Sequence, residues 1–120
     1  MVVAFGSFED LEVWRRASRL AVEIYRLLSD CKDFGLKDQM TRSAVSIASN
    51  TAEGAERGTA ADFKRFLRIA KGSAAELRTQ LYIASEIGLV SSTEKRLELI
   101  MELKAVSSML QGLITSLNNK

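Results

Sequence analysis

Apolar residues recur at three- and four-residue steps along most of this sequence, and this spacing constrains the fold more than any other feature. Residues spaced in this way lie on one face of an α-helix. Four segments show the pattern, at about 8–30, 36–57, 60–87 and 93–117, and the 120 residues contain no proline. An all-β chain of this size would normally use several prolines in its turns. The pattern therefore predicts an all-α fold.

Short polar residues and glycines mark the expected helix ends. A Ser or Thr followed three positions later by an acidic residue opens three of the segments: Ser7 with Asp10, Thr59 with Asp62, and Ser91 with Glu94. Gly58 and Gly88 are expected to end the second and third helices. Because Thr59 follows Gly58 directly, the second and third helices must be antiparallel neighbours. The prediction is an up-down-up-down antiparallel four-helix bundle, one domain over residues 1–120.

The same periodicity predicts which side chains are buried and which pair on the surface. The core face of the first segment is expected to contain Leu11, Trp14, Ala17, Ala21, Ile24, Tyr25 and Leu28. On its outer face, Glu12–Arg16 and Arg19–Glu23 have the i,i+4 spacing of local ion pairs. Gly72, beside Ser73, is expected to permit a close helix crossing.

Groups suited to catalysis are sparse. The chain has no histidine and a single cysteine, Cys31, so no base is present to activate the thiol. We find no metal-ligand set, no phosphate-binding glycine loop and no Ser-His-Asp arrangement. We therefore expect no enzyme, no cofactor and no metal. A lone cysteine fits a reducing compartment, and no apolar run approaches the roughly 20 residues that span a bilayer, so we expect a cytoplasmic protein without a membrane partner.

Basic residues follow one face of the third segment, at Lys64, Arg68, Lys71 and Arg78, with Arg65 beside them. No acidic side chain interrupts this row, which extends over about 20 Å of helix and could follow phosphates. Phe63 and Phe66 belong to the core face, so no aromatic residue is interleaved for base stacking. Such a face would recognise the charge or shape of the nucleic-acid backbone, with little preference for base sequence. A merely solvated basic face is the other interpretation.

A polar stripe lies opposite the core face of the second segment: Gln39, Arg42, Ser46, Asn50, Glu53 and Arg57. Ser and Asn are mediocre helix formers, which a purely exposed face does not require. The stripe therefore indicates a hydrogen-bonded network against another helix or subunit. The alternatives are an ordinary solvent-exposed face and a ligand or catalytic site. The spacing of Glu53 and Arg57 suits an intrahelical ion pair.

The fourth segment carries a second apolar stripe away from its main core face: Leu97, Met101, Ala105 and Met109. One bundle core absorbs one face of a helix, so the stripe predicts an oligomer interface. Methionine suits such a contact because its flexible side chain fills irregular gaps. The alternative is that the first helix or residues 2–5 cover the stripe.

Three stretches of this sequence resemble the bacterial four-helix bundle protein family, which includes proteins encoded within intervening sequences of large-subunit ribosomal RNA genes. They are FEDLEVW (8–14), LKDQMTRSAVSIASNTAEGAERG (36–58) and DFKRFLRIAKGSAAELRTQL (62–81). The resemblance covers about residues 8–90. The sequence departs from the usual pattern at Ala48, where proline is common, at Thr51, where isoleucine is common, and before Leu36, where a proline is missing.

The resemblance implies a four-helix bundle that assembles into a homopentameric ring. The family is similar to the accessory protein of diversity-generating retroelements, a pentameric bundle whose basic surface works beside a reverse transcriptase on nucleic acid. The resulting expectation is a non-enzymatic homo-oligomer, a pentamer, that binds RNA or DNA, and structured RNA in particular, through its basic helix face. The alternative is an assembly module whose main ligand is another protein, such as a polymerase.

Overall fold

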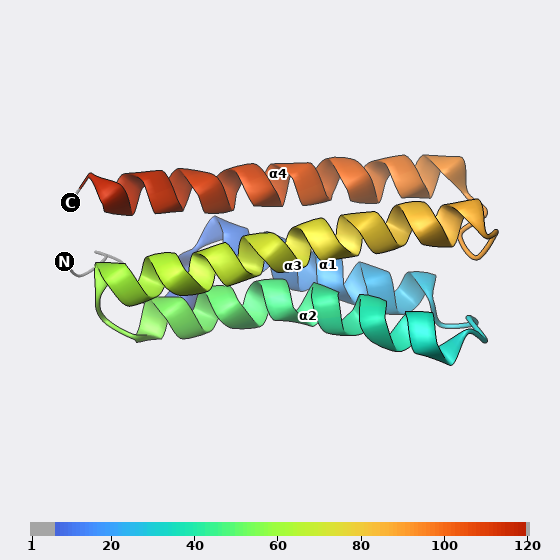
Figure 1. Cartoon of the computed structure of the whole chain (residues 1–120), viewed down its shortest axis with the longest axis horizontal. Coiled ribbons are helices and arrows are strands. Elements are labelled where there is room, and N and C mark those ends of the chain that lie inside the picture. Colours follow the sequence, from blue (N-terminus) through green and yellow to red (C-terminus); the bar gives the residue numbers. More distant parts are fainter. Residues whose placement is uncertain (1–6, 120) are drawn as a thin grey trace.

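The computed structural model describes residues 7–119, which form four α-helices lying side by side and alternating in direction (Figure 1). A 3₁₀ turn, η1 (Phe8–Asp10), comes first. The helices are α1 (Glu12–Leu27), α2 (Phe34–Glu56), α3 (Ala60–Glu86) and α4 (Thr93–Asn118). The molecule measures 46 × 20 × 19 Å. The fold is the predicted all-α four-helix bundle.

The four helices do not pack equally. In Figure 1 α3 lies in front between α2 and α4, with α1 behind. α3 packs most extensively against α2 and then against α4, α1 packs mainly against α2, and α1 meets α4 least. The helices are therefore packed most closely on the two sides of α3, and the packing is loosest between α1 and α4. None of the described helices combines the length and apolar character that a membrane crossing needs.

The predicted capping box of Ser7 and Asp10 forms, but it caps the 3₁₀ turn η1 and not helix α1. Ser7 N–H donates to Asp10 Oδ2 at 3.1 Å, and Leu11 then takes an extended conformation, with φ −78° and ψ 123°. The single helix expected over 8–30 is therefore η1 followed by α1, which ends at Leu27. The rings of Phe8 and Trp14 meet edge to face with centroids 5.1 Å apart, across the break at Leu11.

The start of α2 and the capping residue of α4 differ from the sequence-based expectation. α2 begins two residues before Leu36, because Asp33 Oδ1 accepts the Leu36 N–H at 3.1 Å and caps the helix. α4 is capped by Ser92, whose Oγ accepts the Lys95 N–H at 3.1 Å, and not by Ser91. Apolar periodicity could not locate the start of α2, since Phe34 is 70% exposed.

The buried face of α1 is rotated slightly from the predicted one. Val13 and Leu20, which the pattern omitted, are 2% exposed, whereas Tyr25 is 52% exposed. The prediction that Tyr25 belongs to the core is wrong. The residues of this segment that face the core are Val13, Ala17, Leu20, Ala21, Ile24 and Leu28. Tyr25 lies outside this face, so its ring is exposed to solvent.

The tightest approach of two helices occurs at Gly54 and not at Gly72. A Cβ atom on Gly54 would stand 2.7 Å from Phe66 Cβ and 3.3 Å from the Phe63 carbonyl oxygen. A Cβ atom on Gly72 would meet no atom within 4 Å, so the expected crossing at Gly72 is wrong. Gly58, at φ +86°, supplies the left-handed turn that sends α3 back along α2. This turn and the contact at Gly54 fix the start of α3, where the basic residues lie.

Candidate functional site

The α3 basic face, which we define as Lys64, Arg65, Arg68, Lys71 and Arg78, has few acidic partners. Arg65 pairs with Asp62 at 3.5 Å. Across the described residues, no ion pair joins the other four cations to a carboxylate. Arg65 and Arg68 are exposed, and the other three are half-buried against neighbouring side chains. The face therefore presents largely uncompensated positive charge.

Two lysines of this face are positioned by α4, a feature that sequence reasoning missed. Lys64 Nζ donates to Asn118 Oδ1 at 2.9 Å, and Lys71 Nζ donates to Gln111 Oε1 at 2.7 Å. Both partners are neutral amides, so neither contact places a negative charge beside a lysine. Lys64 and Lys71 are seven residues apart on α3, and Gln111 and Asn118 are seven residues apart on α4. This equal spacing predicts the two contacts only when the register between α3 and α4 is known.

Phe66 connects the start of the α3 basic face to the end of α2. The guanidinium carbons of Arg57 and Arg65 lie 4.9 and 4.6 Å from the centroid of its ring. Such contacts hold guanidinium groups over an aromatic face. The ring is only 6% exposed, so it is not available to stack on a base. Arg57, assigned from sequence to the polar stripe, thus lies beside the basic face.

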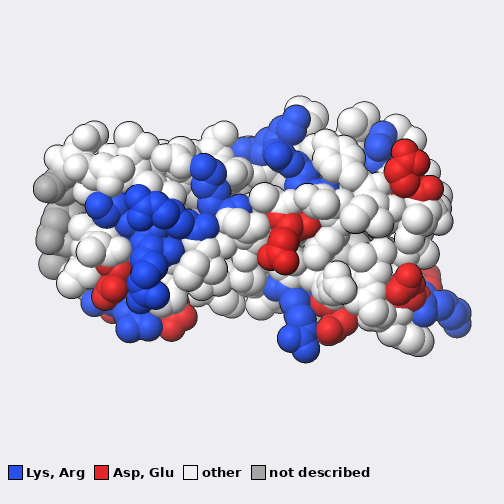
Figure 2. Space-filling view, in the orientation of Figure 1, with Lys and Arg blue, Asp and Glu red and all other residues white. Residues whose placement is uncertain are grey.

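Figure 2 shows how the charges are distributed over the side of the bundle where α3 lies in front. Lys and Arg side chains gather over the half that contains the start of α3 and extend toward α4. Acidic side chains lie along the lower edge of this view and over its other half. The positive charge is therefore concentrated locally, although the net charge of the chain is only +2.

The polar stripe of α2 divides into a central network and two solvated ends. Ser46 Oγ lies 2.8 Å from Ser73 Oγ of α3, and Asn50 Nδ2 donates to the Ser46 carbonyl and hydroxyl oxygens at 2.9 Å. The network joins α2 to α3. A groove of about 290 Å³ runs beside it, lined by Gln39, Arg42, Ser43, Ser46, Ser73, Glu76 and Gln80.

The ends of the stripe form local ion pairs in solvent. Arg42 Nε donates to Asp38 Oδ2 at 3.0 Å, and the Arg42 side chain is 79% exposed. Arg57 pairs with Glu53 at 3.5 Å, as the i,i+4 spacing predicted, with both side chains about half exposed. Exposed pairs of this kind contribute about 0–1 kcal/mol. Of the stripe, Ser46 hydrogen-bonds to α3 and the Arg57 guanidinium lies over the Phe66 ring of α3, whereas Asn50 hydrogen-bonds back to Ser46 on α2.

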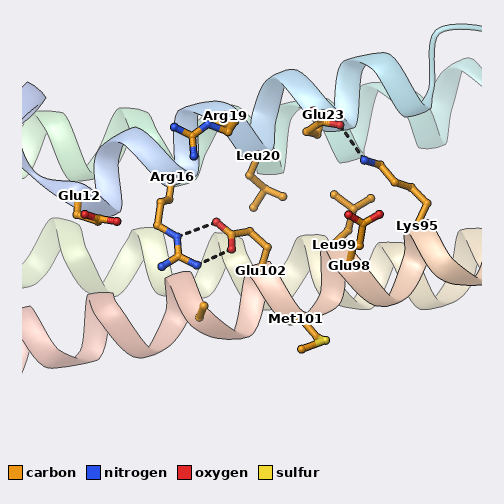
Figure 3. A pocket seen from close by; sticks show the side chains of 11 residues that line it. Glu12, Arg16, Arg19, Leu20, Glu23, Lys95, Glu98, Leu99, Met101 and Glu102 are labelled. Atoms are coloured by element: carbon orange, nitrogen blue, oxygen red, sulfur yellow. Dashed lines mark hydrogen bonds and ion pairs between the residues drawn. The ribbon is translucent and has the colours of Figure 1, made fainter.

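A groove of about 820 Å³ separates α1 from α4, and two ion pairs bridge it (Figure 3). Arg16 donates to both carboxylate oxygens of Glu102, at 2.6 and 2.9 Å, and Lys95 Nζ donates to Glu23 Oε2 at 2.9 Å. The hydrogen bond from Lys95 and its charge lower the pKa of Glu23, and the same bond raises the pKa of Lys95. The two bridges thus neutralise four of the charged side chains that line the groove, Arg16, Glu23, Lys95 and Glu102.

These bridges correct the local pairing expected on the first helix. Arg16 binds Glu102 and not Glu12, and Glu23 binds Lys95 and not Arg19. Helix spacing alone could not reveal this, because the better partners lie on a helix more than 70 residues away in sequence. Both ion pairs connect α1 to α4, two helices that pack against each other less extensively than the other neighbouring pairs of helices.

The second apolar stripe of α4 is exposed at one end and covered at the other. Leu97 and Met101 are 51% and 69% exposed. Ala105 lines the groove toward α1, and Met109 packs against the core, with its Sδ 3.6 Å from Arg16 Nη1. The first helix therefore covers part of the stripe. Residues 2–5, the other expected cover, lie outside the described residues.

Nothing in the described part of the chain groups three or more His, Cys, Asp or Glu side chains where they could hold a metal ion. Among the surfaces described above, the α3 basic face is the one whose side chains best match a particular kind of ligand. Guanidinium and ammonium groups without carboxylate partners are suited to bind phosphates.

Comparison with known proteins gives the family. The family model described as 23S rRNA-intervening sequence protein matches residues 9–112. The chain belongs to this family. The match runs from η1 through most of α4, so it includes every residue of the α3 basic face. It confirms the resemblance that residues 8–90 indicated.

A solved structure from the S23 ribosomal protein family, a protein of unknown function from Bacteroides thetaiotaomicron VPI-5482, is similar in fold. Its TM-score is 0.79 at 25% sequence identity, covering 85% of this chain and 97% of that chain. No curated protein matches the sequence. The 23S rRNA-intervening sequence protein family and this relative thus agree with the helical bundle.

Proposed function

We propose that this protein is a non-enzymatic nucleic-acid-binding bundle and that the α3 basic face makes the contact. The observation that carries the proposal is the set of four cations, Lys64, Arg68, Lys71 and Arg78, that no described carboxylate neutralises. From Lys64 to Arg78 the helix rises about 21 Å, at about 1.5 Å per residue, which is long enough to follow several phosphates.

Salt dependence of binding tests the proposal. Four phosphate contacts give a slope of log affinity against log salt of about −3 to −4, so affinity should fall roughly a hundredfold between about 50 and 200 mM salt. The measurement is fluorescence anisotropy with labelled RNA and DNA over that range. The absence of binding at the lowest salt, where such contacts are strongest, would refute the proposal.

We further propose that the chain forms a homo-oligomer, a pentamer by its resemblance, through the exposed end of the apolar stripe on α4. Leu97 and Met101 are large apolar side chains, both more than half exposed. Exposed apolar strips of this kind mark interaction sites. A ring of copies would also repeat the basic face around one assembly and so strengthen binding.

Replacing Leu97 and Met101 together by Lys is expected to break the oligomer and leave each bundle folded, because neither side chain supports the core. Light scattering at about 10 μM should give a larger mass than the 13.3 kDa monomer for the wild type and a mass close to it for the variant. Met109 is left unchanged, since it packs against the core. A monomeric wild type contradicts assembly, and an assembled variant places the contact elsewhere.

A protein ligand, such as a polymerase, is the second candidate function. Tyr82, Ile83 and Ile87, at the end of α3, are 45%, 49% and 58% exposed, and such a surface suits a protein partner. An apolar contact of this kind would respond little to salt, so the titration above separates the two functions.

A further inference from the structure

The α3 basic face continues onto α4, and the combined surface has a regular arrangement. Lys64 contacts Asn118 and Lys71 contacts Gln111, one step of seven residues apart on both helices. A further step of seven residues reaches Arg78 on α3 and Lys104 on α4. We call this surface the α3–α4 face and define it by Lys64, Lys71, Arg78, Lys104, Gln111, Thr115 and Asn118.

Carboxylates are absent from the central part of this surface. α3 carries none between Lys64 and Ala75, and α4 carries none between Leu103 and Asn119. Cations recur every seven residues on α3, a rise of about 10 Å, and neutral amide groups lie beside Lys64 and Lys71. A ligand here therefore meets alternating positive charges and uncharged hydrogen-bonding groups.

The neutral groups keep donors and acceptors available. The lysines occupy the amide oxygens of Asn118 and Gln111, which leaves the amide nitrogens to donate. Gln111 Nε2 reaches the Thr115 hydroxyl at 3.3 Å, and that hydroxyl can donate onward. Asn118 Nδ2 has no hydrogen-bond partner among residues 7–119. Gln111, Thr115 and Asn118 are all exposed.

The surface lacks the groups that hold unpaired bases. α4 contains no aromatic residue, and Phe63 and Phe66 of α3 are buried. Tyr82, the exposed aromatic nearest the cations, lies a turn beyond Arg78. Single-stranded nucleic acid is normally held by aromatic stacking beside a basic groove. The α3–α4 face therefore favours a duplex, whose bases are already stacked.

Shape and hydrogen bonding distinguish between the two kinds of duplex. Two packed helices with axes about 8–10 Å apart form a broad surface that cannot enter the B-DNA minor groove, which is about 6 Å wide, and the B-DNA major groove, about 12 Å wide, has room for one helix and not for two side by side. The minor groove of A-form RNA is wide and shallow and displays 2′-hydroxyls, which both donate and accept hydrogen bonds. Amide and hydroxyl groups between phosphate-binding cations match that groove.

We propose that the α3–α4 face binds double-helical RNA, with its cations on phosphates and Gln111, Thr115 and Asn118 on 2′-hydroxyls of the minor groove. The proposal rests on the proposed function, because it assumes that the basic face contacts nucleic acid. It adds the class of nucleic acid and the three neutral residues that distinguish RNA from DNA.

The test compares a duplex RNA, a DNA duplex of the same sequence and the single RNA strand, each titrated by anisotropy at several salt concentrations. The wild type should bind duplex RNA at least about tenfold more tightly than either other probe. The variant Gln111→Ala/Thr115→Ala/Asn118→Ala should lose about tenfold for duplex RNA alone, as expected for two or three net hydrogen bonds, and keep its salt slope. Circular dichroism should show unchanged helix content.

The matched control is Gln39→Ala/Ser49→Ala/Thr79→Ala, three exposed polar residues outside the α3–α4 face. It should bind all three probes like the wild type. Equal affinity for the two duplexes, single-strand binding as tight as duplex binding, or an unaffected triple variant would each overturn this inference while the proposed function stands. If no probe binds at low salt, the proposed function fails and this inference fails with it.

Discussion

Replacing Lys64, Arg68 and Lys71 together by Gln is expected to weaken nucleic-acid binding on the order of a hundredfold or more at about 50 mM salt, and to flatten the salt slope by about one for each cation. None of the three has a carboxylate partner among the described residues, so their charge is available for phosphates. Anisotropy titrations of wild type and variant at several salt concentrations measure both quantities.

The variant should remain folded, because the hydrogen bonds that Lys64 and Lys71 make with α4 are exposed. The control is Arg19→Gln/Arg26→Gln/Lys32→Gln, which removes the same net charge from exposed positions outside α3 and α4. It should keep most of the affinity. An equal loss in both variants would show that net charge, and not the α3 basic face, controls binding.

Gly54→Ala is expected to lower the free energy of unfolding by about 1–3 kcal/mol, the usual result of overpacking a core. The new methyl group would stand 2.7 Å from Phe66 Cβ, and that atom is fixed to the backbone of α3, so the two helices must separate. Chemical denaturation followed by circular dichroism measures the loss. Protein concentration must be the same for all variants, because assembly would add to the apparent stability.

Gly72→Ala is the matched control, and the expected change has the opposite sign. A methyl group there meets nothing within 4 Å, and alanine is the better helix former by about 0.5–1 kcal/mol. The variant should therefore unfold at a slightly higher denaturant concentration than the wild type. If both alanine variants were stabilised, the close approach of α2 and α3 at Gly54 would be contradicted.

The sequence by itself determined the helices and the composition of each helix face. Apolar spacing depends only on the chain's own helical period, so the bundle and the burial of Phe63 and Phe66 on α3 were predictable. The α3 basic face was predictable for the same reason, since all five residues lie on one helix. The turn at Gly58 followed from two adjacent residues with known conformational preferences.

Only the tertiary structure decided which helix faces meet and how they are aligned. Periodicity gives no information about the rotation of one helix against another or about the register between them. It therefore missed the bridges from Arg16 to Glu102 and from Glu23 to Lys95. It also placed the tight helix crossing at Gly72, when packing requires it at Gly54. The amides of Gln111 and Asn118 join the basic face for the same reason, because the antiparallel register of α3 and α4 brings residues some 40 to 54 positions apart into contact.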